Sequence, residues 1–393
     1  RCTAAIATLH ASRWPCARPG DSRWRKTETS QRSRPCRRRQ TRYCFVVIHR
    51  QDPSGGRSDG RVAAIGPFHA GPAHRCHTLH PPQGPDSLEN NMPRSARIIE
   101  PSKLGDFGLR LIGTTDIDGN GTQHAVDQVD PIVLFDFVKT RTGGKSAFRP
   151  HPHFGLTAMS FLPSTGAWGA WDSLAGESDH ELHPGGLYYV HAGSQAFHHE
   201  FATPETTAAD EVVEFVQLVW NATDETDVRT VILQPDELPV LASEDHIVRV
   251  MAGNLCGLEA PQPFSHRDII YAYVQLLSDR SLELDLPRTM NGMLFPIEGG
   301  MKVNEEELGE QRMMILGDDG GTLSVFRSDP NQPTRFLIAA GEPTNRPFYK
   351  LLGLGGFIIG ETENGVRAMM TELEKQAEGI KKEVPHYFPE QYL

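Results

Sequence analysis

The sequence has no apolar run that approaches the roughly 18 residues of a membrane-spanning helix. It is also short of cysteine: it has 6 in 393 residues, and only Cys256 falls after Met92. The first absence argues against a helical membrane anchor. The second supports neither a disulfide framework nor a paired-cysteine zinc module, because the five early cysteines lack C-x-x-C spacing. We therefore expect no membrane partner and no need for an oxidising compartment.

Positive charge is scarce outside the first quarter of the chain. Of 39 Lys and Arg and 50 Asp and Glu, residues 1–91 hold 16 and 6, a net charge of +10. The remaining 23 basic and 44 acidic residues give residues 92–393 a net charge of −21. Since nucleic-acid phosphates require a basic face, the acidic part argues against direct nucleic-acid binding.

Residues 1–91 are rich in Arg, Pro, Ser and Gly and have almost no periodic apolar run, a composition typical of disorder. We expect an upstream extension that does not fold, since the chain begins with Arg and Met92 opens a compact acidic sequence. An organelle transit peptide and a basic nucleic-acid or nuclear-import patch are the alternatives. The expected location is the cytoplasm, or the nucleus in a eukaryote, with organelle targeting left open.

Residues 92–393 contain short alternating apolar runs separated by Gly, Pro, Asn and Asp, which is typical of antiparallel strands in a sandwich or barrel. Two blocks of similar length follow each other, joined by an acidic connection near residues 224–244. The repetition predicts an all-β fold with two consecutive antiparallel β-barrels, over residues 92–230 and 231–393. Representative runs are PIVLFDFV, LTAMSFL and VEFVQLVW in the first block, and DIIYAYVQLL, GMLFPIEG and RFLIAAG in the second.

The tail has a different period. Apolar residues from Val366 to Ala377 recur at helical spacing, which predicts one amphipathic helix with Thr362 as N-cap and Gly379 as its stop. We expect the methionine pair in this helix to pack in the core.

Histidine is concentrated in one part of the chain: of the 11 after Met92, seven lie between residues 151 and 199. Within this region, His151-Pro152-His153 places two imidazoles on one face of an extended strand, because side chains alternate between faces. Pro152 then points away and indicates a strand end or an edge strand.

The segment His198-His199-Glu200 repeats this geometry, with His198 and Glu200 on one face. Two such pairs from neighbouring strands would supply three neutral nitrogens and one carboxylate. This set suits one divalent Fe, Mn, Ni or Cu ion, with coordination positions left open. The predicted metal ligands are His151, His153, His198 and Glu200.

The ordinary alternative is that these histidines lie on the surface or hydrogen-bond in the core. His180, Glu181 and His183 form a competing cluster, although they lie in a polar, turn-like stretch. His191 and His199 could support metal-bound imidazoles through orienting hydrogen bonds, or could lie on the surface.

At these residues the sequence resembles the pirin family of two-barrel cupins, over about residues 97–380. Two departures concern the site: Ser194-Gln195 stands where the family usually has Arg-Gly, and the apolar WGAWD stretch stands in a region that tends to be polar. We expect these to alter the pocket entrance and the substrate. The matching stretches are DPIVLFDF, HPHFGLTAMSFL, DSL, HPGGLYYVHAG, FHHE, VQLVWN, FLIAAGEPTNRPF and LGLGGFIIGET, followed by the terminal helix.

The resemblance implies a bicupin fold and one bound metal, with Fe(II) favoured and Ni, Mn or Cu as alternatives. Ligation by the H-x-H and H-x-E pairs carries over to the four residues named above. The general cupin pattern adds a Glu shortly after H-x-H, and its absence between Phe154 and Met159 favours pirins. The second barrel has His266 alone on its strand segment, so we expect it to be structural or a docking surface. Many pirins are monomeric, which predicts a monomer.

The activity that the resemblance implies is that of a quercetin 2,3-dioxygenase-type oxidoreductase acting on a flavonol or a related enolic substrate. The metal would serve as Lewis acid and template, and Glu200 would be the catalytic group that accepts the substrate hydroxyl proton. The alternative is a metal- or redox-sensing protein that binds transcription regulators without catalysis. The expected partner is therefore a small phenolic molecule or a protein.

Overall fold

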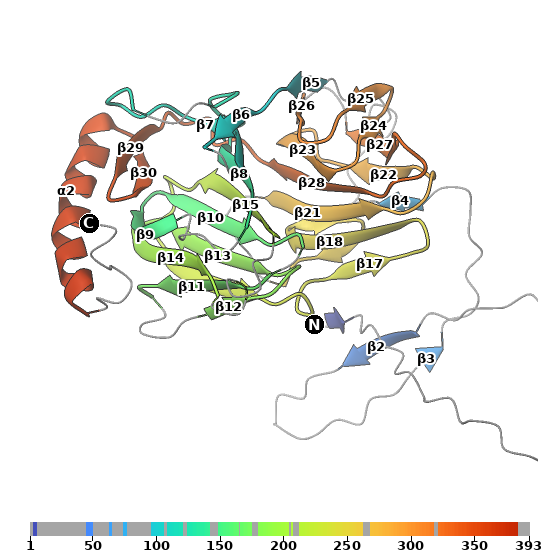
Figure 1. Ribbon diagram of the computed structural model, residues 1–393, viewed down its shortest axis with the longest axis horizontal. Coiled ribbons are helices and arrows are strands. Elements are labelled where there is room, and N and C mark those ends of the chain that lie inside the picture. Colours follow the sequence, from blue (N-terminus) through green and yellow to red (C-terminus); the bar gives the residue numbers. More distant parts are fainter. Residues whose placement is uncertain are drawn as a thin grey trace, which may run out of the picture. The chain divides into compact units, whose positions relative to one another are not determined.

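The computed structural model describes residues 96–383 with short gaps, together with four short segments before them (Figure 1). The expectation for residues 1–91 falls mostly outside the described residues. No helix among the described residues is long and apolar enough to cross a bilayer. The early segments are 3–5, 45–49, 63–64 and 74–76; the gaps are 106–107, 121–123, 142–147, 165, 175–179, 204–205, 207–211, 262–267 and 318–320.

The chain divides into two compact units, Arg1–Pro72 and Ala73–Leu393. The first contains a three-stranded sheet of β1 (Thr3–Ala5), β2 (Phe45–His49) and β3 (Ala63–Ala64). The second unit contains everything described below. The predicted boundary between two barrels at residue 230 stays a prediction.

The first half of the second unit pairs a seven-stranded sheet with a four-stranded one. Apolar side chains from both sheets, including Trp168, Tyr188 and Phe215, form one buried cluster between them. In order, the large sheet has β16 (Val228–Leu233), β13 (Leu187–Ala192), β10 (Leu156–Phe161), β15 (Val212–Asn221), β8 (Ile132–Arg141), β7 (Gly108–Gly113) and β6 (Ser102–Leu104), and the small sheet has β12 (His180–Leu182), β11 (Trp168–Asp172), β14 (Ala196–Ala202) and β9 (Phe148–His153).

The second half repeats this plan with a seven-stranded and a five-stranded sheet and its own buried cluster. The large sheet has β17 (Val240–Ala242), β18 (His246–Ala252), β21 (Ile269–Leu276), β28 (Thr334–Gly341), β23 (Asn291–Glu298), β26 (Met313–Leu316) and β5 (Ala96–Ile99). The small sheet has β25 (Glu306–Leu308), β24 (Met301–Val303), β27 (Thr322–Arg327), β22 (Leu282–Asp285) and β4 (His74–Cys76), and a separate hairpin joins β19 (Asn254–Leu255) to β20 (Leu258–Glu259).

The two large sheets pack against each other through the faces that their own small sheets do not cover. Alternation of side chains along β8 directs Phe135 and Phe137 to this interface, where their ring centres lie 4.9 and 5.6 Å from that of Phe295. Phe161 and Tyr273 meet there as well, at 5.3 Å. The runs of apolar residues on both faces of these strands are explained by this double burial.

The first strand of this unit packs in its second half, and the last elements of the unit pack on its first half. Near its start, β5 joins the large sheet of the second half. At its end, the hairpin of β29 (Tyr349–Gly353) and β30 (Gly356–Gly360) and the helix α2 (Glu363–Glu383) pack on the first half, as Figure 1 shows beside β9 and β14. Neither half is therefore complete without chain from the other.

The helix α2 begins where the sequence predicts but ends later than predicted. The backbone N–H of Gly365 donates to Oγ1 of Thr362 at 3.1 Å, so Thr362 is the N-cap as predicted. The predicted stop at Gly379 is wrong, because α2 continues to Glu383. Ala377 and Ile380 extend the apolar stripe into the cluster that α2 shares with β14, and this packing offsets the roughly 1 kcal/mol that a helical glycine costs.

Cys256 is disulfide-bonded, which the lack of paired cysteine spacing did not suggest. Spacing reveals short-range modules and not the pairing of cysteines that are far apart in sequence. This bond corrects the expectation, drawn from the spacing, that the cysteines support no disulfide.

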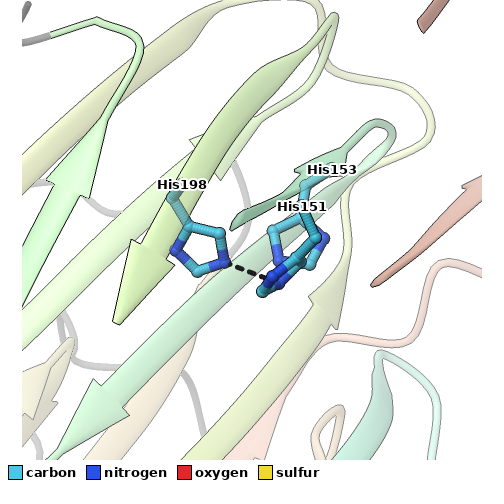
Figure 2. A group of neighbouring side chains, drawn as sticks. All are labelled: His151, His153 and His198. Atoms are coloured by element: carbon cyan, nitrogen blue, oxygen red, sulfur yellow. Dashed lines mark hydrogen bonds between the residues drawn. The ribbon is translucent and has the colours of Figure 1, made fainter. Parts of the chain in front are cut away.

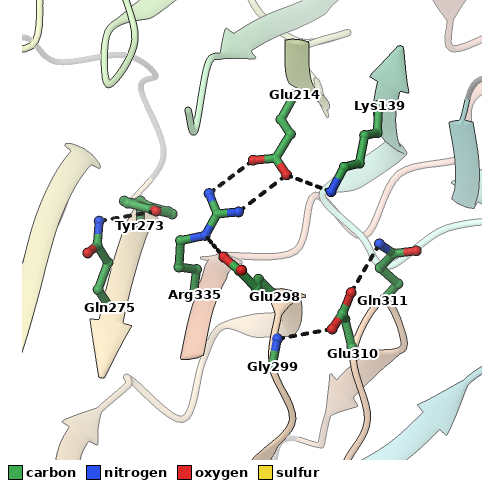
Figure 3. Close-up of polar contacts among 9 residues, drawn as sticks. All are labelled: Lys139, Glu214, Tyr273, Gln275, Glu298, Gly299, Glu310, Gln311 and Arg335. Atoms are coloured by element: carbon green, nitrogen blue, oxygen red, sulfur yellow. Dashed lines mark hydrogen bonds and ion pairs between the residues drawn. The ribbon is translucent and has the colours of Figure 1, made fainter. Parts of the chain in front are cut away.

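A cluster of charges spans the interface between the halves (Figure 3). The guanidinium of Arg335 on β28 donates to both carboxylate oxygens of Glu214 on β15, at 2.9 and 3.2 Å, and also to Glu298. The ammonium of Lys139 lies 3.2 Å from Glu214. Burial raises the pKa of Glu214, but the hydrogen bonds and charge of Arg335, together with hydrogen bonds from Ser164 and Lys139, outweigh it and hold this pKa below its ordinary value. The pair is therefore ionised in the folded protein.

We expect Arg335→Ala to lower the free energy of unfolding by about 3 kcal/mol, because it leaves a buried carboxylate without its main partner. The measurement is urea unfolding. Arg280→Ala is the matched control, since Arg280 is 60% exposed in its pair with Asp245 and should change stability by less than about 1 kcal/mol.

The stability that Glu214 contributes through its pair with Arg335 falls at low pH. Because the pKa of Glu214 is lowered on folding, its contribution is complete above the ordinary glutamate value of roughly 4 and disappears as pH falls through the folded value. Equal losses for both variants at neutral pH would contradict this account.

Candidate metal centre

The pairing of β9 with β14 brings the two histidine motifs together. His198 lies directly opposite His151, and Ala196 lies opposite His153. Because paired residues in antiparallel strands point to the same face, the three imidazoles share the inner face of the small sheet. β9 is the last strand of that sheet, which confirms the edge position that Pro152 predicted.

The three rings converge on one point (Figure 2). One nitrogen from each of His151, His153 and His198 lies within 4.8 Å of the others. The Nε2 atoms of His151 and His198 are 2.9 Å apart, and the ring centres are separated by 4.4 to 4.8 Å. All three side chains are buried.

The tautomer of His153 follows from its neighbour in the C-terminal hairpin. Nδ1 of His153 lies 3.1 Å from the carbonyl oxygen of Phe357. A carbonyl only accepts, so Nδ1 carries the hydrogen and Nε2 keeps a lone pair. This Nε2 is buried and has no hydrogen-bond partner. Lone pairs left in this way inside a protein are the donor atoms that metal ions take.

Burial keeps two of these rings neutral. It lowers the pKa of His153 to about 3, with the charge of His151 adding to the effect. Burial also lowers the pKa of His198 well below its ordinary value, assisted by the neighbouring histidines. Neutral imidazole is the form that binds metal, so His153 and His198 are in the binding form at neutral pH. The set of three imidazole nitrogens suits a divalent transition metal ion.

Glu200 lies on the same strand but stands apart from the three nitrogens. Its side chain is fully buried, yet its carboxylate does not belong to the group within 4.8 Å. The register of β9 and β14 shifts between His198 and Glu200, and such a bulge re-aims a side chain. Burial raises the pKa of Glu200 to about 7, against a hydrogen bond from Ser160 that lowers it. Ligation by Glu200 stays a prediction.

The other histidine candidates lie elsewhere. His180 is 3.7 Å from Asp172, and His183 is 3.9 Å from Glu181, both in partly exposed positions; they form no ligand group among the described residues. His199 is buried on the opposite face and stacks on Phe201 at 5.0 Å.

The surface alternative is therefore wrong for His199, and also for His191, which is buried away from the three rings beside two carboxylates. His266 lies outside the described residues. Within the described part of the chain, neither group of potential metal ligands includes a residue after Asp227.

Sequence reasoning missed the support that the end of the chain gives to this site. A Cβ on Gly356 would lie 2.4 Å from Cδ2 of His151, so only glycine lets β30 approach this closely. The N–H of Ile359 donates to the carbonyl of Phe154 at 3.0 Å, which fastens the hairpin beside His153. The LGLGGFIIGET motif contains Gly356 and forms part of the hairpin. Nothing in its local sequence indicates that it packs against the distant His151.

The departure at Ser194-Gln195 has a structural role. Nε2 of Gln195 donates to Oε1 of Gln376 at 2.8 Å, which ties the turn between β13 and β14 to α2.

The WGAWD stretch is β11 and is buried throughout. Trp168 contributes to the core between the sheets, and Trp171 packs in the cluster with α2.

Comparison with known proteins finds similarity to pirins and to proteins named quercetin 2,3-dioxygenase. A family model for the Pirin C-terminal cupin domain matches residues 271–374. A Pseudomonas aeruginosa protein provisionally named a quercetin 2,3-dioxygenase is 24% identical over 257 residues, which cover 60% of this chain and 82% of that protein. Pirin-1 of Arabidopsis thaliana is 24% identical over 252 residues, covering 62% and 81%.

A solved structure shares the fold. The crystal structure of a quercetin 2,3-dioxygenase from Acinetobacter baumannii aligns with a TM-score of 0.59 at 19% identity, over 72% of this chain and 96% of that one. This likeness confirms the predicted class of two consecutive cupin-type units of antiparallel sheet followed by a helix.

His153→Ala and His198→Ala should each bind one metal ion fewer per chain than the unmodified protein, because two nitrogens in a buried, apolar setting do not replace three. The measurement is metal content by mass spectrometry after loading with Ni²⁺ and dialysis. His180→Ala is the control and should keep its metal. Loss of metal in the His180 variant would favour the competing cluster.

Gly356→Ala should weaken metal binding by at least about 10-fold, as expected when the surroundings of a ligand are disturbed, because the added Cβ displaces the ring of His151. Calorimetric titration with Ni²⁺ measures the effect. Gly379→Ala is the matched control, since a Cβ there meets nothing within 4 Å. Equal affinities in the two variants would show that the hairpin does not position His151.

Proposed function

We propose that this chain, which is similar to pirins and matches the Pirin C-terminal cupin domain over residues 271–374, is a metal-dependent dioxygenase acting on a flavonol or a related enolic substrate. The observation that carries the proposal is the convergence of three buried imidazoles on one point of the first half, two of them held neutral by burial. Names of similar proteins that refer to quercetin 2,3-dioxygenase add the substrate class.

His151, His153 and His198 would hold the ion. When bound, it supplies Lewis-acid polarisation of substrate oxygens and a template for the reactants. Fe(II) is the favoured ion, and Ni, Mn and Cu suit the same donors. Phe357 contributes by holding the hydrogen of His153 on Nδ1, so the Nε2 lone pair always faces the site.

Glu200 is proposed as the group that accepts the substrate hydroxyl proton. It lies two residues from His198 and is fully buried, with a hydrogen bond to Ser160. A carboxylate in this setting can take a proton without competition from water. Its approach to the ion as a fourth ligand is part of the proposal and would require its side chain to turn toward the imidazoles.

Tyr188 and Asp172 complete the polar wall beside His198. The Tyr188 hydroxyl donates to Oδ2 of Asp172 at 3.3 Å, and Oδ1 of Asp172 accepts from Thr230 at 3.2 Å. Burial and the neighbouring carboxylates raise the pKa of Tyr188 well above its usual value, so the phenol stays protonated. These residues would orient a substrate through fixed hydrogen-bonding groups.

Glu200→Gln should reduce O₂ consumption with quercetin by at least about 100-fold, the lower range for loss of a general base, and should retain metal through the three histidines. An oxygen electrode measures turnover, and metal content is determined on the same sample. Glu237→Gln, at an exposed position, is the control. Full activity in the Glu200 variant would exclude its role as proton acceptor.

The same assay separates the second candidate function, a metal- or redox-sensing protein that binds transcription regulators. The net charge of −21 over residues 92–393 favours a basic protein partner for this role. Absence of O₂ consumption with Fe-, Ni-, Mn- and Cu-loaded protein would support the sensing function. The monomeric state and the cytoplasmic or nuclear location remain part of both proposals.

A further inference from the structure

A second group of potential metal ligands shares no residue with the first. His191 lies on β13, and Glu225 and Asp227 lie in the connection between β15 and β16. Nε2 of His191 is 3.3 Å from Oε2 of Glu225 and 3.4 Å from Oδ1 of Asp227. The side chains of His191 and Glu225 are buried, whereas that of Asp227 is 44% exposed. The group is therefore closed toward the protein and reachable from solvent.

These separations suit a shared cation better than a hydrogen bond. A good N–H···O bond joins atoms about 2.9 Å apart, and Nε2 of His191 has no hydrogen-bond partner despite full burial. An ion bound at about 2.05 Å from a nitrogen and an oxygen, with tetrahedral angles, would separate those atoms by about 3.35 Å. Both observed distances fall next to this value.

The other nitrogen of His191 is anchored. Nδ1 lies 2.7 Å from Oγ1 of Thr157, which is paired with His191 across β10 and β13. When Nδ1–H donates to this hydroxyl, Nε2 presents its lone pair to two carboxylates, an arrangement that requires a positive charge between them. In the opposite tautomer, Nε2–H points between the carboxylates and no ion is needed. The two arrangements differ in whether a cation binds.

A proton is a poor candidate for that positive charge. Burial lowers the pKa of His191; Glu225 and Asp227 oppose this effect, and Arg229 adds to it. Arg229 is paired with His191 across β13 and β16, and its guanidinium lies 5.9 Å from the ring centre of Tyr189. One arginine against two carboxylates leaves this neighbourhood with excess negative charge at neutral pH.

We propose that His191, Glu225 and Asp227 form a second site, for a divalent cation of the zinc type. One nitrogen and two carboxylate oxygens are donors that zinc accepts, and three protein ligands leave a position for solvent on the exposed side of Asp227. The ion joins the β15–β16 connection to the end of β13, just before the turn that leads to His198. The proposal does not depend on the dioxygenase function.

The test uses full-length protein that carries His153→Ala, which removes the first site. Titration with Zn²⁺ in a calorimeter should show one remaining ion per chain, and zinc should raise the melting temperature. Adding Asp227→Ala should abolish both effects. Asp227 is suited to this test because its half-exposed side chain can be shortened without opening the core, whereas His191 is fully buried.

Asp224→Ala in the same background is the matched control, since Asp224 is an exposed acidic residue of the same connection outside the ligand group. This variant should bind zinc like its parent. Three results would overturn the proposal: no zinc binding by His153→Ala protein, zinc binding that survives Asp227→Ala, or an equal loss in the Asp224 variant. The last would reduce the effect to general surface charge.

Discussion

Desolvation of three imidazoles is the constraint on which the candidate metal centre depends. Removing water from a histidine disfavours its charged form, and the pairing of β9 with β14 places three such rings where they exclude water from one another. Neutral rings have one lone pair each. Once Phe357 takes the hydrogen of His153, the lone pair of that ring has no acceptor role left except toward a cation.

The support for this centre comes from the opposite end of the chain. The hairpin β29–β30 contacts β9 directly, with Gly356 against His151 and Phe357 against His153. Lys350 on β29 also contacts Phe357: its ammonium lies 4.8 Å from the centre of that ring. The same ammonium donates to the carbonyl of Thr114 at 2.7 Å. A protein that ended before the hairpin would lack these contacts, so the second half contributes to the site although it supplies none of the predicted ligands.

The two ligand groups of the first half differ in chemistry. The first has three imidazole nitrogens in a buried setting, which suits ions that bind imidazole and exchange further ligands. The second combines one imidazole with two carboxylates, one of them half exposed. Because carboxylates neutralise a divalent charge and neutral imidazoles do not, an ion in the first group keeps more of its positive charge available to polarise a bound molecule.

The sequence by itself determined the strands, because alternating apolar runs bounded by Gly and Pro have few other solutions, and it determined the histidine pairs, because a two-residue period places His151 and His153 on one face. It also determined the N-cap at Thr362. Tertiary structure alone decided what depends on contacts between distant segments: the register shift that separates Glu200 from the imidazoles, the carbonyl that selects the tautomer of His153, and the meeting of His191 with Glu225 and Asp227. Local sequence carries the preferences of neighbouring residues, whereas the aim of a buried side chain is set by whichever strand or loop folds against it.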